Sequence, residues 1–199
     1  MCIRDSITAA PLACGGLTAY RAVDHGIKAL APMQRQGRVL LIGVGGLGQY
    51  AIRYLRLLTN AKVIALDVAE DKRSRALELG ADEAIGPDED IAPCDLIIDF
   101  IGSDITLATA AGAVARKGMI VVVGLGGGQT NFGLGKVPPE ARFMTSFWGT
   151  RQQMDELLDL ARREPSIMLS VETLPLSDAQ HAHNRLREGQ VAGRIVLIP

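Results

Sequence analysis

The chain has 199 residues, of which 48% are hydrophobic and 22% are charged, a balance typical of a globular protein that excludes wholesale disorder. Because 21 lysines and arginines nearly cancel 22 aspartates and glutamates, no field of one sign is available to bind nucleic acid or an anionic membrane. Glycine is abundant at 22 residues, which predicts backbone that turns sharply or approaches a ligand closely.

The cysteines and the start of the chain indicate the cellular setting. Cys2, Cys14 and Cys94 are too few and too scattered for a disulfide framework, which favours a reduced, cytoplasmic protein. No apolar run is long enough to span a membrane. Residues 1–6 lack the apolar region of a signal peptide and run directly into a segment that reads as structured, so we expect them to be a leader foreign to the fold.

From residue 38 onward, strand-length apolar runs alternate with helical periodicity. Residues 38–43 form a continuous apolar run, and apolar residues then recur at helical spacing between 47 and 58. Strand–helix alternation of this kind predicts an α/β protein with a doubly wound parallel sheet and helices on both faces. The same pattern predicts further strands at 62–67, 83–85, 94–100, 119–123 and 142–148, and helices at 70–79, 104–115 and 151–163.

Two segments depart from this regular alternation. Only residues 86–93 separate the strands at 83–85 and 94–100, whereas a parallel crossover usually needs a dozen or more residues. Either 83–85 is barely a strand, or a crossover helix is missing. The tail predicts a strand at 171–174, a helix opened by a capping box at 177–180 and closed by Gly189, and a strand at 194–198.

A glycine-rich motif at 43–48 directly follows the first strand and opens the first helix. Gly43 permits a tight turn, Gly45 leaves space for a pyrophosphate, and Gly48 lets the helix pack closely on the strand. The helix N-terminus adds free N–H groups and partial positive charge. The motif predicts a dinucleotide site, the alternative being a glycine-rich turn with only a structural role. The expected cofactor contacts are Gly43, Gly45, Gly46, Leu47 and Gly48.

Asp67 is an acid at the carboxyl end of the second strand, 19 residues after Gly48. A carboxylate in this place can accept hydrogen bonds from the adenosine ribose and would repel a 2′-phosphate, so we predict NAD rather than NADP. The alternative is a helix N-cap or a solvated turn residue. Lys72 could reach the same ribose, or belong to a solvated helix face.

Seven stretches of the chain match one known pattern: 10–20, 41–48, 79–82, 98–102, 121–124, 147–151 and 186–194. On these matches, residues 9–199 resemble the C-terminal, NAD-binding part of a zinc-dependent medium-chain alcohol dehydrogenase. The resemblance implies a Rossmann domain over 31–169. It also implies that 7–30 and 170–199 are remnants of a GroES-like catalytic domain.

The resemblance implies roles for individual residues. Cys14 would be the third protein ligand of a catalytic zinc, the alternative being a small buried residue. Thr18, one helical turn later, would lie beside the nicotinamide and the metal. Arg194 would reach the pyrophosphate, the alternative being a solvated charge at a strand start. The cofactor cleft would be lined by Ile101, Gly102, Val123, Gly124 and Leu125, with Phe147 and Trp148 either near the nicotinamide amide or in the core.

The implied activity is hydride transfer between NAD and a small alcohol or carbonyl substrate, with zinc as Lewis acid. The family's earlier cysteine and His-Glu pair do not occur before Cys14. We therefore expect an incomplete fragment that binds the cofactor, from an enzyme that forms a homodimer or homotetramer when full-length, with no nucleic-acid or membrane partner. The alternatives are a zinc-free quinone or enoyl reductase of the same superfamily, or a non-catalytic NAD-sensing module.

Overall fold

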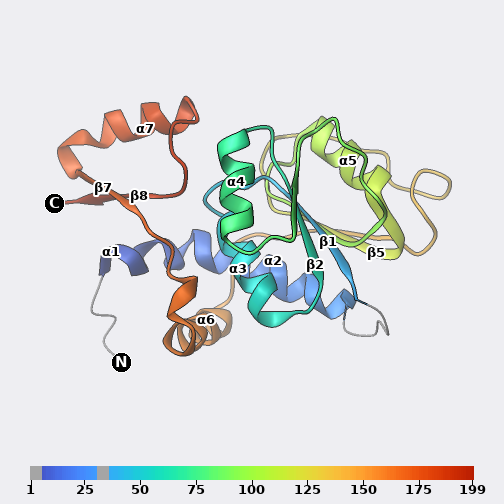
Figure 1. Cartoon of the computed structure of the whole chain (residues 1–199), viewed down its shortest axis with the longest axis horizontal. Helices are drawn as coiled ribbons and strands as arrows, with labels where there is room; N and C mark the ends of the chain where they lie inside the picture. The colour runs from blue at the N-terminus through green and yellow to red at the C-terminus, as the bar shows by residue number, and fades with distance from the viewer. Residues whose placement is uncertain (1–5, 31–35) are drawn as a thin grey trace.

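The computed structural model of the chain describes residues 6–30 and 36–199 (Figure 1). Its centre is a six-stranded sheet in the order β3-β2-β1-β4-β5-β6, in which every neighbouring pair is parallel. The strand order reverses between β1 and β4, which confirms the doubly wound Rossmann topology. The strands are β1 (Arg38–Ile42), β2 (Lys62–Leu66), β3 (Glu83–Ile85), β4 (Cys94–Asp99), β5 (Val114–Val122) and β6 (Arg142–Thr145).

Alternate residues of the central strands belong to two separate hydrophobic clusters, one on each face of the sheet. Leu41 and Ile98 pack in the cluster that also holds apolar residues of α2, α3, α4 and α6, whereas Leu40 and Ile97 pack with α5. Helices therefore cover both faces, as predicted. They are α2 (Gly15–Leu30), α3 (Gly48–Leu58), α4 (Glu70–Glu78), α5 (Asp104–Ala113) and α6 (Arg151–Arg163).

The short connection at 86–93 links two parallel strands that are not neighbours in the sheet. β3 is a strand paired with β2, and β4 lies on the far side of β1, so the connection passes across two strands. The connection contains no helix, and Ile91 packs against the α5-side cluster. Both alternatives hold, because β3 is a strand of only three residues and the connection lacks a crossover helix.

Two predicted strand boundaries differ from the structure by several residues, and the helix expected over 104–115 ends at Ala113. The fifth strand was expected to begin at Met119, after Gly118, but β5 already begins at Val114 and contains an irregularity in its pairing with β4. Lys117 adopts a φ of 64° just before Gly118, so the glycine sits inside an irregular strand and not at its start. The sixth strand ends at Thr145 instead of Trp148, because Trp148 has a φ of 53° and leaves extended geometry.

The tail forms a small unit of its own, which we call the C-terminal lobe: β7 (Glu172–Pro175), α7 (Ala179–Arg187) and β8 (Ile195–Ile198). β7 and β8 pair in parallel as a separate two-stranded sheet, drawn in orange and red to one side of the main sheet (Figure 1). The predicted capping box at 177–180 is wrong, because a 3₁₀ turn, Leu176–Asp178, precedes α7 and Ser177 bonds Asp178 instead. Gly189 does follow the helix, with a φ of 72°.

Two further helical segments precede α2: α1 (Ser6–Ala9) and the 3₁₀ turn η1 (Ala10–Ala13). Of the predicted leader, residues 1–5 lie outside the described residues and Ser6 begins α1. Within the described part of the chain, no helix combines the length and the apolar character needed to cross a bilayer.

Candidate functional site

The glycine-rich turn between β1 and α3 has the geometry that its sequence predicts. Gly43 adopts a φ of 91°, which a residue with a side chain rarely tolerates. A Cβ on Gly48 would lie 2.0 Å from the carbonyl oxygen of Gly43, so only glycine lets α3 begin this close to the turn. A Cβ on Gly45, in contrast, would have no atom within 4 Å. The backbone at Gly45 therefore faces open space at the N-terminus of α3.

Arg194 lies directly against this turn. A Cβ on Gly46 would come within 2.6 Å of the arginine Nε, and a Cβ on Gly15 within 2.1 Å of one guanidinium nitrogen. The guanidinium thus occupies space that two glycines leave free, between the start of α2 and the glycine-rich turn. Its Nε is buried and has no hydrogen-bond partner. A buried donor without a partner is costly, and a bound anion would satisfy it.

Asp67 follows β2 and is only 7% exposed. One carboxylate oxygen accepts the Val44 N–H at 2.8 Å, and the other accepts the Ala69 N–H at 3.0 Å. The N-cap of α4 is Ala69, so the reading of Asp67 as an N-cap or a solvated turn residue is wrong. Each carboxylate oxygen has capacity for a further hydrogen bond, so the group can still accept from a ribose.

Two adjacent basic residues on α4, Lys72 and Arg73, follow Asp67 in the chain. The sequence alone allowed Arg73 to form a solvated helix face with Lys72, but Arg73 is half-buried and donates to the backbone carbonyl of Asp67 at 2.9 Å and to that of Val68 at 2.9 Å. It thereby fixes the path of the chain between β2 and α4. Lys72 is half-buried on the first turns of α4, and its contact with a ribose stays a prediction.

The loops after β4 and β5 pack against each other backbone to backbone. The fully buried Asp99 accepts the N–H groups of Ile101 at 2.8 Å and of Gly102 at 3.0 Å through one carboxylate oxygen. A Cβ on Gly124 would lie 2.1 Å from the backbone of Ile101. The Ile101 side chain in turn reaches Gly43, where a Cβ would meet it at 2.8 Å.

These loops therefore bring part of the predicted cleft lining to the glycine-rich turn. Val123 is buried at the end of β5, whereas Leu125 is exposed. Asp99 is a residue that the sequence analysis missed. The signal that identified Asp67, an acid at the end of a buried strand, would have found it.

Phe147 and Trp148 are surface residues, 65% and 58% exposed, so their alternative reading as core aromatics is wrong. Their rings pack on each other with centroids 5.4 Å apart. The next residue, Gly149, lies so close to α2 that a Cβ would come within 2.6 Å of the Leu17 side chain. The aromatic pair therefore lies two residues or fewer from a glycine that packs against the first turn of α2.

Cys14 is exposed where η1 meets α2, so its reading as a small buried residue is wrong. It lines a cavity of about 220 Å³ together with Pro11, Gly15 and Arg194. Thr18 is buried one turn further on, and its N–H bonds the Cys14 carbonyl at 2.9 Å. Within residues 6–30 and 36–199, no three histidine, cysteine or acidic side chains gather into a metal-binding group. The described residues alone therefore do not fit a zinc ion.

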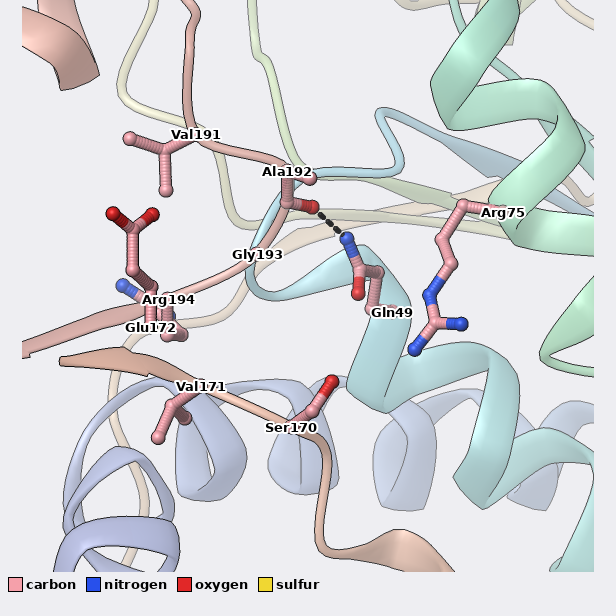
Figure 2. A pocket seen from close by; sticks show the side chains of 9 residues that line it. All are labelled: Gln49, Arg75, Ser170, Val171, Glu172, Val191, Ala192, Gly193 and Arg194. Atoms are coloured by element: carbon pink, nitrogen blue, oxygen red, sulfur yellow. Dashed lines mark hydrogen bonds between the residues drawn. The ribbon is translucent and has the colours of Figure 1, made fainter.

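A larger cavity, of about 360 Å³, lies where the C-terminal lobe meets α3 and α4 (Figure 2). Gln49 and Arg75 line one side, and residues 170–172 and 191–194 line the other. Gln49 is buried and donates from its amide to the carbonyl of Ala192. No local sequence pattern marks Gln49, because its hydrogen-bond partner lies 143 residues away in the chain.

Comparisons with known proteins agree with this geometry. A family model described as zinc-binding dehydrogenase matches residues 46–163. The NAD-dependent alcohol dehydrogenase of Sulfolobus acidocaldarius is 33% identical over 96% of this chain and 57% of its own length. The chain thus spans a little over half the length of this curated relative.

Solved structures give the same picture. The alcohol dehydrogenase of the hyperthermophilic archaeon Aeropyrum pernix superimposes with a TM-score of 0.86 at 34% identity, over 96% of this chain and 58% of that one. Acetophenone reductase from Geotrichum candidum, solved in complex with NAD, superimposes with a TM-score of 0.83 at 27% identity, over 96% and 55%.

Proposed function

Because the chain belongs to the zinc-binding dehydrogenase family, we propose that it binds NAD and forms the cofactor-binding part of an alcohol dehydrogenase. The observation that carries the proposal is the Arg194 guanidinium, whose buried Nε has no partner and which lies against Gly46 of the glycine-rich turn. When bound, NAD supplies the acceptor for a hydride from the alcohol carbon. The curated and solved relatives named above are alcohol dehydrogenases and a ketone reductase, which supports the same reaction class.

The chain's own residues bind the two ends of the cofactor differently. The diphosphate would lie against the open backbone at Gly45 and accept hydrogen bonds from the N-terminus of α3 and from Arg194. The Asp67 carboxylate accepts from the adenosine ribose, with Lys72 beside it. Gly43, Leu47 and Gly48 shape the turn, and Ile101, Gly102, Val123, Gly124 and Leu125 line the cleft at the strand ends.

The nicotinamide end lies toward α2 in this proposal. Phe147 and Trp148 would form an apolar wall there, and Thr18, buried on the first turns of α2, would lie beside the nicotinamide. Exposed aromatic rings of this kind suit a small alcohol or carbonyl substrate with an apolar body.

Zinc requires residues beyond those that the structure describes. A bound zinc ion supplies Lewis-acid polarisation of the alcohol oxygen. Cys14 supplies one thiolate toward it, and the remaining ligands come from elsewhere in the full enzyme, since the described residues do not complete a site. Cofactor binding is therefore the activity we assign to this chain, and alcohol oxidation to the full-length protein. The same proposal assigns residues 7–30 and 170–199 to the catalytic domain and 31–169 to the NAD-binding domain.

The proposal extends to assembly and location. β6 ends the main sheet and leaves an open edge. An open edge can pair with another chain, so the full-length enzyme would be a homodimer or homotetramer. The cytoplasm suits an enzyme with free thiols at Cys14 and Cys94.

The cofactor preference tests this function directly. Fluorescence titration should show that the chain binds NADH at least about tenfold more tightly than NADPH, because Asp67 repels a 2′-phosphate. Asp67→Asn removes the charge, keeps one of the two backbone hydrogen bonds through its amide oxygen, and should reduce that preference to within about threefold. Asp71→Asn, at an exposed acid on the first turn of α4, should leave the preference unchanged. Equal wild-type affinities would contradict the NAD assignment, and failure to bind either nucleotide would contradict the function.

A further inference from the structure

Gln49 is a buried polar side chain at the start of α3, only 3% exposed. It lies on the wall of the 360 Å³ cavity between α3 and the C-terminal lobe (Figure 2). Across the cavity runs a short stretch of chain, residues 191–194, which we call the return segment. Figure 2 shows the Gln49 amide pointing from α3 toward the return segment.

The Gln49 amide joins two parts of the chain that are far apart in sequence. Its Nε2 donates to the carbonyl of Val44, inside the glycine-rich turn, at 3.4 Å, and also to the carbonyl of Ala192. A Cβ on Gly193 would lie 3.7 Å from Oε1 of Gln49, so the return segment crosses within van der Waals reach of this side chain. Gln49 therefore ties the glycine-rich turn to the residues just before Arg194.

The place of Arg194 depends on the path of the return segment. On the far side, the Arg194 carbonyl accepts the Glu172 N–H at 2.9 Å, where the chain enters β8. On the near side, the Gln49 bond to Ala192 holds the chain two residues before the arginine. The Arg194 guanidinium contacts Gly15 and Gly46, but its Nε makes no hydrogen bond that could anchor it. The backbone on either side must therefore hold the guanidinium in register with the turn.

We propose that Gln49 is a positioning residue that holds the return segment so that Arg194 lies ready over the glycine-rich turn to bind a dinucleotide diphosphate. The inference rests on the proposed function and adds the means by which the binding site is held in advance. Without the Gln49 amide, ligand binding must order the return segment and the arginine side chain, and that ordering opposes binding. Gln49 then acts on the ligand only through Arg194.

A double-mutant cycle tests this dependence. The variants are Gln49→Met, which removes the amide at similar volume, Arg194→Met, and the pair together, each titrated with NADH. We expect Arg194→Met to weaken NADH binding about 10- to 100-fold and Gln49→Met to weaken it about tenfold. In the Arg194→Met background, Gln49→Met should have no further effect. Gln180→Met, at an exposed glutamine of the C-terminal lobe, should leave NADH affinity unchanged.

Adenosine, which lacks phosphates, separates positioning from a general loss of structure. Its affinity, followed by NMR titration, should change less than about twofold in Gln49→Met, because it does not need Arg194. Gln49→Asn, which shortens the side chain but keeps the amide, should show the same pattern in case the methionine variant folds poorly.

Three results would overturn the proposal while leaving NAD binding intact. They are additive losses in the cycle, equal losses for NADH and adenosine in both Gln49 variants, and loss of folding in both. A wild-type chain that binds no NADH would instead overturn the proposed function.

Discussion

Gly45 and Gly48 belong to one motif but have different surroundings in the structure. A Cβ on Gly48 would lie 2.0 Å from the carbonyl oxygen of Gly43. The equivalent position at Gly45 has no atom within 4 Å. In the proposed site, Gly45 therefore leaves space for the ligand, whereas Gly48 is required by the fold.

Two alanine substitutions separate these requirements. Gly48→Ala should lower the free energy of unfolding by about 1–3 kcal/mol, because a backbone carbonyl must move to admit the methyl group. Gly45→Ala should leave stability within about 0.5 kcal/mol and weaken NADH binding at least about tenfold, because its methyl group enters the diphosphate space. Urea denaturation and NADH titration of both variants check this. The reverse pattern, with Gly45→Ala the unstable variant, would contradict the assignment.

The residues of the candidate site differ in how visible they are in the sequence. Gly43, Gly48 and Asp67 stand in one short stretch whose spacing carries its own physical meaning, so they could be predicted. The hydrogen bonds of Asp67 to Val44 and Ala69 could not, because they depend on how β2 lies beside β1. Gln49 left no signal at all, since its role depends on a carbonyl near the other end of the chain.

At the scale of elements, Gln153 is one of the side chains that join α2 and α6, beside the Tyr20 hydroxyl, which donates to Glu156 at 3.3 Å. Gln153 closes a capping box with Thr150 at the start of α6. The same side chain accepts from Arg21 at 3.1 Å and donates to Asp24 at 3.2 Å, both on α2. Because α2 begins at the Cys14–Thr18 turn and α6 follows Phe147 and Trp148, this contact joins the two segments that we propose to flank the nicotinamide.

Gln153→Leu should therefore lower the free energy of unfolding by about 1–3 kcal/mol, since Arg21 and Asp24 lose a partner in a part-buried place. The matched control is Gln152→Leu, whose exposed amide bonds only Glu156 within α6. This control should change stability by less than about 0.5 kcal/mol. Both values come from urea denaturation followed by circular dichroism. Equal effects of the two substitutions would show that Gln153 is an ordinary cap residue without a role between helices.

Local signals predicted an element well where the tertiary structure agreed with them. The helix at 151–163 was predicted with its observed bounds, because its apolar stripe faces the core and its N-cap forms. The capping signal at 177–180 failed, since the chain forms a 3₁₀ turn before α7. Gly118 looked like the start of a strand but lies inside β5, where Lys117 with positive φ absorbs the irregularity. Sequence alone does not tell a glycine that ends a strand from one inside an irregular strand.

For the whole molecule, the candidate site is assembled from three distant regions. The start of α2, the glycine-rich turn and the return segment meet around Arg194. The doubly wound parallel sheet could be predicted from the strand–helix alternation, and the dehydrogenase family from seven matching stretches of sequence. The packing of the C-terminal lobe against the glycine-rich turn could not be predicted in this way, since it depends on contacts between segments far apart in the chain.

We propose above that a dinucleotide binds at the glycine-rich turn beneath Arg194. Trp148 is the single tryptophan of the chain and lies at the proposed nicotinamide end, so energy transfer from its fluorescence to the reduced nicotinamide reports binding at this site. Titration with NADH should quench Trp148 to a saturating level with one site per chain, and Arg194→Met should shift the midpoint at least about tenfold higher. Quenching that does not saturate, or an identical midpoint in Arg194→Met, would contradict the account.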